Sequence, residues 1–335
     1  MKIRIEELEL ALTEPELTSC YPNRVDWQRV SAIQQMQLEY QHLNFLLQTL
    51  DWWQVSLLDL RAAVELLGSK LDVALFQEAE EMTTHLGQKL DQWELQQQYA
   101  SSYDFRGVFL EIQASTNDAD TQYWTEMLLR MYGRFGELNN YPVRLIDEEM
   151  GEIGWKSVTI EINAYYAYGY LRTESGVHRL TRISPFSVDQ KTSLAIVRVM
   201  PILDDLAKWQ IPEADLQVVT FDAPRGNVNR LDLSIKVIHS PTGVSAVCRD
   251  GRSQGQNKAK AISVLKAKLF AIAQAQGVAS ISEIQPQRIA TIRSELLLRD
   301  YLFDESRVKD HRTGEETTNL AAVLDGELDR RLSLR

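Results

Sequence analysis

The sequence predicts an α+β protein of several domains, and three features of its residue pattern indicate this. Apolar residues recur every three or four positions through the first hundred residues, the spacing of amphipathic helices. Segments in which apolar and polar residues alternate follow after residue 104, as in half-buried strands. These strands and the later helices do not form repeated strand–helix–strand units, which favours α+β domains over a parallel sheet.

Length and composition set the broad class of the chain. Its 335 residues correspond to two or three domains of about 150 residues, and 44% of them are hydrophobic. Cys20 and Cys248 form neither a disulfide framework nor a Cys-x-x-Cys motif. No run of about 18 apolar residues occurs, and Met1–Glu9 lacks the basic, apolar pattern of a signal peptide. We therefore expect a soluble cytoplasmic protein or, after removal of a transit peptide, one of an organellar stroma or matrix.

The first predicted elements are long helices. Apolar residues at helical spacing cover residues 33–50, 57–71 and 75–90. Gly68 and the Asp51–Trp53 stretch are the expected interruptions of a helical hairpin or bundle. The apolar stripe is a packing pattern, and no chemistry is visible in it.

Strands and two helices follow the helical region. Four segments alternate between apolar and polar residues or are rich in apolar residues, and are expected to be strands: 109–112, 158–162, 233–237 and 244–248. Asn117 or Asp118 can cap a helix between the first two strands. The last two strands form a hairpin around a Ser-Pro-Thr-Gly turn. Ser253 and Gln256 have capping-box spacing for a helix over about 256–276.

Charge is distributed unevenly along the chain. There are 36 basic and 47 acidic residues, a net charge of −11 at pH 7. Residues 223–270 nevertheless hold nine basic residues, opposed by Asp232 and Asp250 alone. A basic segment on an acidic protein indicates either a polyanion-binding surface or a solvated amphipathic helix, and charge by itself leaves both open.

Five motifs are more specific than composition. They are Met-Leu-Leu-Arg-Met-Tyr at 127–132, Tyr-Ala-Tyr-Gly-Tyr-Leu-Arg-Thr-Glu-Ser-Gly-Val-His-Arg-Leu at 166–180, Ser-Pro-Phe at 184–186, Arg-Ser-Gln-Gly-Gln-Asn-Lys at 252–258 and Val-Leu-Asp-Gly at 323–326. Together they resemble the bacterial class-I peptide chain release factors, and the Ser-Pro-Phe tripeptide makes release factor 2 the closest branch. The close resemblance extends from about Asp104 to Asp329.

The resemblance implies a multidomain release-factor architecture. It has a helical domain (1–103), a central α+β decoding-type domain (104–206), an α/β domain of the Gly-Gly-Gln type (207–281) and a C-terminal segment packed on the central domain (282–335). Members of the family enter the ribosomal A site, read a stop codon and hydrolyse peptidyl-tRNA with a Gly-Gly-Gln loop. The implied partners are the ribosome, through its rRNA and A site, and mRNA, with tRNA a further candidate. We expect a monomer with no cofactor and no membrane contact.

Codon reading by resemblance depends on residues around the tripeptide. The matching positions are Ser184, Pro185, Phe186, Thr192 and Asp120. Hydroxyl and aromatic side chains suit this task, because single-stranded bases are read by edge hydrogen bonds and stacking. The loop after the tripeptide is several residues shorter than in the family, and Lys191 stands where the family has histidine. Asp120 keeps the charge of a family glutamate on a shorter side chain, and these departures put stop-codon specificity in doubt.

The catalytic loop departs further from the family pattern. The family reads approximately Gly-Ala-Gly-Gly-Gln-His-Val-Asn-Arg, whereas residues 222–230 read Asp-Ala-Pro-Arg-Gly-Asn-Val-Asn-Arg. Pro224, Arg225 and Gly226 thus replace Gly-Gly-Gln. Proline fixes φ and lacks an N–H, arginine is a poor general base, and glycine has no side chain to direct water. We therefore predict no enzymatic activity by the family route, with residual ester hydrolysis left open.

Residues that support this loop match the family and would contact RNA. By resemblance they are Asn229, Arg230, Arg252, Ser253, Gln254, Asn257 and Lys258. Basic groups among them would neutralise phosphates. His178 and His239 have no Cys, Asp or second His at metal-ligand spacing, so we expect structural or RNA-contacting roles and no metal site.

Three functions remain open on the sequence. The first is a release-factor-2-like protein that binds the A site or RNA without hydrolysing peptidyl-tRNA, in a regulatory, rescue or mRNA-protecting role. The alternative is a working release factor that terminates translation at UGA or UAA, with a backbone N–H near Gly226 stabilising the transition state. A free mRNA-binding protein without a ribosomal role ranks third, because the remainder of the chain is strongly acidic.

Overall fold

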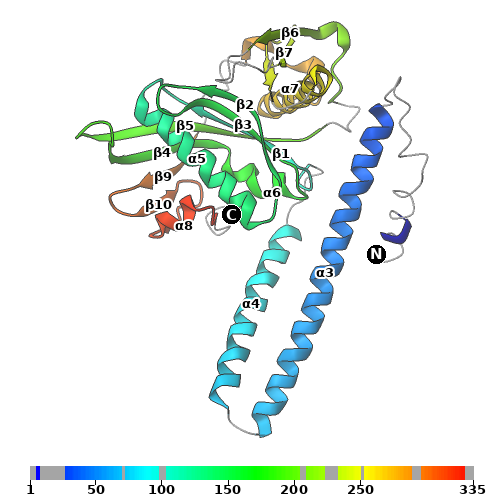
Figure 1. Ribbon diagram of the computed structural model, residues 1–335, viewed down its shortest axis with the longest axis vertical. Coiled ribbons are helices and arrows are strands. Elements are labelled where there is room, and N and C mark those ends of the chain that lie inside the picture. The colour runs from blue at the N-terminus through cyan, green and yellow to red at the C-terminus, as the bar shows by residue number, and fades with distance from the viewer. Residues whose placement is uncertain are drawn as a thin grey trace. The chain divides into compact units, whose positions relative to one another are not determined.

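A computed structural model describes most of the chain (Figure 1). The described residues are 5–7, 27–69, 72–97, 103–203, 209–222, 233–249, 253–288 and 296–328. The chain divides into two compact units, Met1–Ser102 and Tyr103–Arg335. Over the described ranges, every helix is too short or too polar to cross a lipid bilayer.

The first unit contains a helical hairpin. Helix α3 spans Trp27–Ser69 and helix α4 spans Val73–Gln97. Asp72 begins α4 by accepting hydrogen bonds from the backbone N–H groups of Ala74 and Leu75, at 3.0 and 3.3 Å. The expected interruption at Asp51–Trp53 is wrong, because α3 runs through these residues, and no proline or glycine lies among them to break it.

The second unit is built on a sheet of eight strands. Its order is β11-β10-β9-β4-β5-β1-β3-β2, and β4 and β9 are parallel while the other neighbours are antiparallel. The strands are β1 (Val108–Ala114), β2 (Val143–Met150), β3 (Trp155–Ile162), β4 (Gly176–Ile183), β5 (Gln190–Pro201), β9 (Leu297–Leu302), β10 (Arg307–Asp310) and β11 (Glu316–Thr317). The predicted strands at 109–112 and 158–162 are confirmed as β1 and β3.

One apolar core joins this sheet to helix α5 (Ala119–Leu138). Trp124, Leu128 and Met131 of α5 are fully buried in it together with apolar residues of β1, β3 and β5. Short helices α6 (Ala167–Leu171) and α8 (Leu320–Leu324) contribute residues to the same core, and helix η1 (Arg172–Glu174) directly follows α6. Since C-terminal strand β9 pairs with β4, the end of the chain supports the strand that leads to the Ser-Pro-Phe tripeptide.

A second core joins the eight-stranded sheet to a smaller sheet and a helix. The smaller sheet has the order β6-β7-β8, with β6 at Leu216–Asp222, β7 at Leu233–His239 and β8 at Ser245–Cys248. Short helix η3 (Glu213–Asp215) precedes these strands in the chain. Helix α7 (Gln254–Gln276) follows them and packs on the smaller sheet. Helices η4 (Ile281–Glu283) and η5 (Pro286–Arg288) follow α7. The predicted hairpin and the helix near 256–276 are confirmed, α7 beginning two residues earlier.

Buried ionic groups lie beside β4. Arg299 of β9 is 1% exposed and donates to both carboxylate oxygens of Glu174, at 2.8 and 2.9 Å, and to Asp310 at 3.4 Å. His178 of β4 lies between the Tyr301 hydroxyl, 3.1 Å from Nδ1, and the Glu174 carbonyl, 3.0 Å from Nε2. Burial lowers the pKa of His178 to about 4, so the ring is neutral at pH 7. His178 is therefore a structural residue of the β4–β9 junction.

Candidate nucleic-acid interface

The tip of the β4–β5 hairpin carries the Ser-Pro-Phe tripeptide. Register is continuous from Gly176↔Val197 to Ile183↔Gln190, and the Ser184 N–H donates to the Asp189 carbonyl at 3.0 Å just beyond the last pair. The tip therefore comprises residues 184–189, between two long and fully paired strands. This pairing fixes where the tripeptide leaves the sheet.

The N-terminus of α5 forms the other half of the site. Asp118 is the N-cap and accepts from the Thr121 N–H at 3.1 Å, which confirms the predicted capping role. Although burial opposes the change, hydrogen bonds from Thr116 and Thr121 lower the pKa of Asp118. Asp120 lies in the first turn, where the helix dipole favours a carboxylate, and is 2% exposed.

Asp120 connects the helix to the hairpin. Its Oδ2 accepts a hydrogen bond from Ser184 Oγ at 2.8 Å and lies 3.3 Å from Lys191 Nζ. Its Oδ1 lies 3.7 Å from Nη2 of Arg182, an ion pair too long to be a hydrogen bond. One buried carboxylate thus contacts the end of β4, the tip and the first residues of β5.

Aromatic and apolar side chains lie on the outer part of the tip. The Phe186 ring meets Tyr123 of α5 edge-on, with centroids 5.8 Å apart and planes at 83°. The guanidinium of Arg182 lies over the other ring of this pair, 4.8 Å from the Tyr123 centroid. Phe186 remains 44% exposed and Val188 95% exposed, so the tip presents an apolar surface to solvent.

The five predicted codon-reading positions lie on the β4–β5 hairpin and in the first turn of α5. Asp120 and Ser184 are buried, whereas Pro185, Phe186 and Thr192 are exposed. Thr192 pairs with Thr181 across the hairpin and follows Lys191 directly. Sequence reasoning noted Lys191 as a departure from the family but did not anticipate its ion pair with Asp120.

The loop between β6 and β7 is the second predicted site. The two strands remain in register up to Asp222↔Leu233, so residues 223–232 connect the two ends of an antiparallel pair. Pro224, Arg225, Gly226, Asn229, Arg230 and Arg252 lie outside the described residues. Cys248, opposite Ile235, ends β8 near the same end of the hairpin, and α7 begins six residues later.

The first turn of α7 contains the other predicted RNA-binding residues. Ser253 is the N-cap and accepts from the Gln256 N–H at 3.3 Å, and Gln254 and Lys258 are exposed. Asn257 is only 1% exposed, and its Oδ1 lies 3.5 Å from Cys248 Sγ. The side chain of Asn257 therefore packs between α7 and β8, and its RNA-binding role stays a prediction.

Comparison with known proteins agrees with this geometry. The PCRF domain family matches residues 2–197, and the RF-1 domain family matches residues 204–312. The chain belongs to the class-I peptide chain release factors. It is similar to RF2 of Thermus thermophilus at 31% identity, with a TM-score of 0.62 over 97% of this chain and 91% of that chain. The resemblance to the release-factor-2 branch is thus confirmed, as is the mixed α and β fold.

Three of the nine basic residues of the 223–270 segment pair with carboxylates of the large sheet. Lys260 Nζ lies 2.8 Å from Glu161, Lys268 Nζ 2.7 Å from Glu111, and Arg249 Nε 3.0 Å from Asp147. Burial raises the pKa of Asp147, whereas Lys268 and Arg198 outweigh burial and lower the pKa of Glu111. These pairs add a third interpretation of the basic segment, because part of its charge neutralises carboxylates of the same chain.

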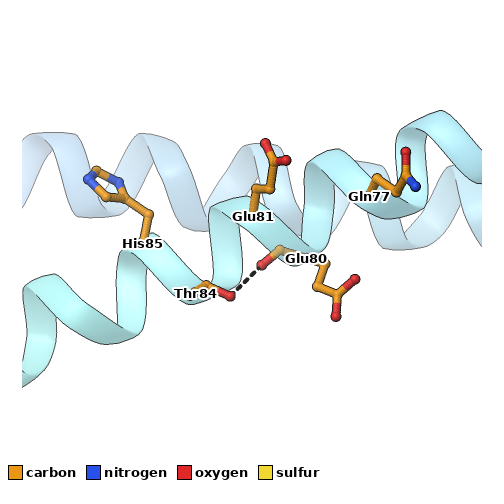
Figure 2. A pocket seen from close by; sticks show the side chains of 5 residues that line it. All are labelled: Gln77, Glu80, Glu81, Thr84 and His85. Carbon is orange, nitrogen blue, oxygen red and sulfur yellow. Dashed lines mark hydrogen bonds between the residues drawn. The ribbon is translucent and has the colours of Figure 1, made fainter. Parts of the chain in front are cut away.

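A group of polar side chains also lies on α4. A shallow pocket on α4 is lined by Gln77, Glu80, Glu81, Thr84 and His85, and Figure 2 shows these side chains. The Thr84 hydroxyl donates a hydrogen bond to the Glu80 carbonyl of the same helix, at 2.9 Å (Figure 2). Across the described ranges, no three His, Cys, Asp or Glu side chains group as metal ligands would. The hairpin tip and the β6–β7 loop therefore remain the candidate sites.

Proposed function

We propose that this release factor occupies the ribosomal A site without hydrolysing peptidyl-tRNA. The observation that carries the proposal is Pro224-Arg225-Gly226 in place of Gly-Gly-Gln, in a loop of the family length. A proline removes a backbone donor, and Gly226 has no side chain to position water at the ester. The protein would then act as a regulator, a rescue or occupancy factor, or an mRNA-protecting protein.

Retained docking residues support the binding half of the proposal. The tripeptide lies at the hairpin tip, Asp120 of α5 binds its Ser184, and Thr192 lies near the start of β5. Gln254 and Lys258 are exposed on the first turn of α7. Aromatic and hydroxyl side chains suit single-stranded RNA, and exposed lysines suit phosphates. The partners are then rRNA and mRNA, with tRNA a further candidate.

Competition with an intact factor tests this function. Ribosomes carrying peptidyl-tRNA and UGA in the A site would receive a release factor with an intact Gly-Gly-Gln loop and increasing amounts of this protein. We expect the rate of peptide release to fall as this protein occupies the A site. An unchanged rate at high concentration would contradict A-site binding, and release by this protein alone would contradict the loss of hydrolysis.

A working release factor is the second candidate, and the continuous β6–β7 register favours it. Pairing up to Asp222↔Leu233 keeps the frame that presents the loop in the family. A backbone N–H near Gly226 would then act alone on the developing oxyanion. Loss of a positioned donor typically costs about 10²–10³ in rate, so such a factor would be slow.

A further inference from the structure

Helices α3 and α4 pack against each other along one side, as in a coiled coil. The two helices run antiparallel, as Figure 1 shows. Residues at alternating intervals of three and four positions are buried or half-buried where they meet. We call these residues the seam, and they include Ser56, Leu60 and Ala63 of α3 and Ala79, Met82 and Leu86 of α4.

The seam divides the surface of the hairpin into two flanks. A residue three positions after a seam residue, or four before it, is turned by about 40–60° toward one flank. Trp52, four before Ser56, and His85, three after Met82, are of this kind. Their rings meet edge-on with centroids 5.4 Å apart, so these turns of α3 and α4 face the same way. Residues with the opposite offsets therefore share the other flank.

This other flank is apolar along its length. Five large apolar side chains have the required offset from the seam and are between 44% and 59% exposed. They are Leu50, Leu57 and Val64 of α3 and Phe76 and Leu90 of α4, and we call them the apolar flank. Those of α3 recur every seven residues, the period at which a further helix packs in a coiled coil. Exposed apolar surface of this extent marks an interaction site.

Charged side chains border the apolar flank on both helices. On α4, Glu80 lies four positions after Phe76 and lines the pocket of Figure 2. On α3, Arg61 lies four positions after Leu57, and its Nε is 3.4 Å from Glu65. The carboxylate of Glu65 thus offsets the positive charge of Arg61, and Glu80 leaves the border negative.

The charge of the whole hairpin selects among three occupants of the flank. Residues 27–97 contain ten acidic and four basic residues. A second copy of this chain would bring the same excess of negative charge. Residues 1–26, with six acidic and three basic residues, would also add like charge. A helix with basic residues beside its apolar positions instead complements the surface.

We infer that the apolar flank binds a basic amphipathic helix of another protein. The partner packs as a third helix beside α3 and α4, with its apolar residues at seven-residue spacing and its lysine or arginine residues toward the carboxylates of the hairpin. This surface belongs to the first unit, whereas the hairpin tip and the β6–β7 loop belong to the second. The inference therefore stands independently of the proposed function.

A fluorescent peptide of three heptads tests the site, with leucine at positions a and d and lysine elsewhere. We expect saturable binding to the full chain at concentrations up to about 100 µM, as for a small interface, measured by fluorescence anisotropy. Helical circular dichroism of the mixture should exceed the sum of the separate signals, because the peptide folds on the flank. The double variant Leu57→Gln and Val64→Gln should raise Kd by about tenfold or more, since both side chains lose apolar burial.

The double variant Val55→Gln and Leu58→Gln is the matched control. It also changes one valine and one leucine of α3, 55% and 59% exposed, which are turned away from the apolar flank. Its Kd should equal that of the natural chain. Absence of binding at about 100 µM, or equal losses in the two double variants, would overturn the site.

Two further results would overturn the choice of partner. One is equal binding of the same peptide with glutamate in place of every lysine, because the acidic border should reject it. The other is dimerisation of the full chain in sedimentation equilibrium that Leu57→Gln and Val64→Gln abolish, which would assign the flank to a second copy.

Discussion

The tip of the β4–β5 hairpin and the loop between β6 and β7 differ in what they retain. Both connect antiparallel strands whose register is continuous to the last pair. The first keeps the family tripeptide and adds the Lys191–Asp120 ion pair, whereas the second keeps its frame and has Pro224-Arg225-Gly226. The two sites therefore have the same kind of strand support and differ in which family residues they carry.

The two sites also differ in how a substitution acts. At the tip, a buried carboxylate fixes the backbone through Ser184, so shape depends on a few hydrogen bonds. In the family loop, activity depends on glycine conformations and one glutamine side chain, and these are the groups that this chain lacks. Binding and hydrolysis should thus be separable in this protein.

Arg299→Ala should produce the largest loss of stability, because Arg299 lies in β9, the strand that pairs with β4 beneath the tip. The variant leaves Glu174 and Asp310 as buried charges without their main partner, which costs about 3–5 kcal/mol of unfolding free energy. Urea denaturation followed by tryptophan fluorescence would measure it. Arg307→Ala, at an exposed ion pair of β10, is the control and should leave the unfolding free energy nearly unchanged. A loss below about 1 kcal/mol for Arg299→Ala would show that the network is dispensable.

Restoring the loop should produce the next largest change. The triple substitution Pro224→Gly, Arg225→Gly and Gly226→Gln should raise peptide release on UGA-programmed ribosomes by about 10²–10³-fold, because it restores donors at the scissile ester. Pro224→Gly, Arg225→Gly and Gly226→Ala is the matched control without the glutamine. If the glutamine variant gains nothing although it binds ribosomes, the frame under the loop does not present it as in the family.

The pH dependence of stability tests the β4–β9 junction. Burial lowers the pKa of His178 to about 4, from about 6.5 when unfolded, so its contribution is complete above pH 6.5 and lost as pH falls towards 4. Between pH 7 and pH 5 the natural protein should therefore lose about 2 kcal/mol of unfolding free energy through His178. In His178→Asn, which has no titrating ring, the drop in unfolding free energy from pH 7 to pH 5 should be smaller by this amount. Urea denaturation at each pH would measure both proteins. Parallel losses would mean that His178 does not titrate as its burial requires.

Removal of one ion pair beneath α7 should have the smallest effect. Lys268→Ala takes one of two partners from Glu111 and should cost about 1 kcal/mol of unfolding free energy, since Arg198 remains 3.3 Å from that carboxylate. Lys258→Ala removes an exposed lysine of the same helix and should leave stability unchanged. Equal losses in the two variants would contradict the assignment of Lys268 to the sheet surface.

Local elements were predictable from the sequence, and long-range contacts were less so. Alternation and capping residues identified β1, β3, the β7–β8 hairpin and the Asp118 cap, because these signals depend on neighbours in sequence. Asp51–Trp53 was misread, since its pattern break lies inside a continuous helix. The parallel β4–β9 pair joins residues more than one hundred positions apart, and no local pattern encodes it.

The candidate site was predictable in its residues and not in its contacts. Resemblance to the family identified Ser184, Phe186 and Asp120, and the structure places them together. Residue spacing in the sequence does not predict the three hydrogen bonds of the Ser184 hydroxyl. One of them requires α5 to pack beside the tip, and the other two come from backbone N–H groups of the tip itself. The acidic partners of Lys260 and Lys268 of α7 likewise come from β3 and β1, about one hundred or more positions earlier in the chain.

Peptide release at saturating A-site occupancy tests the central claim most directly. Ribosomes with UGA in the A site and labelled peptidyl-tRNA would be mixed with excess protein, and occupancy and release would be measured in the same sample. We predict full occupancy with a release rate within about tenfold of spontaneous hydrolysis, because the loop lacks Gly-Gly-Gln. Release as fast as that of a factor with an intact loop would contradict it.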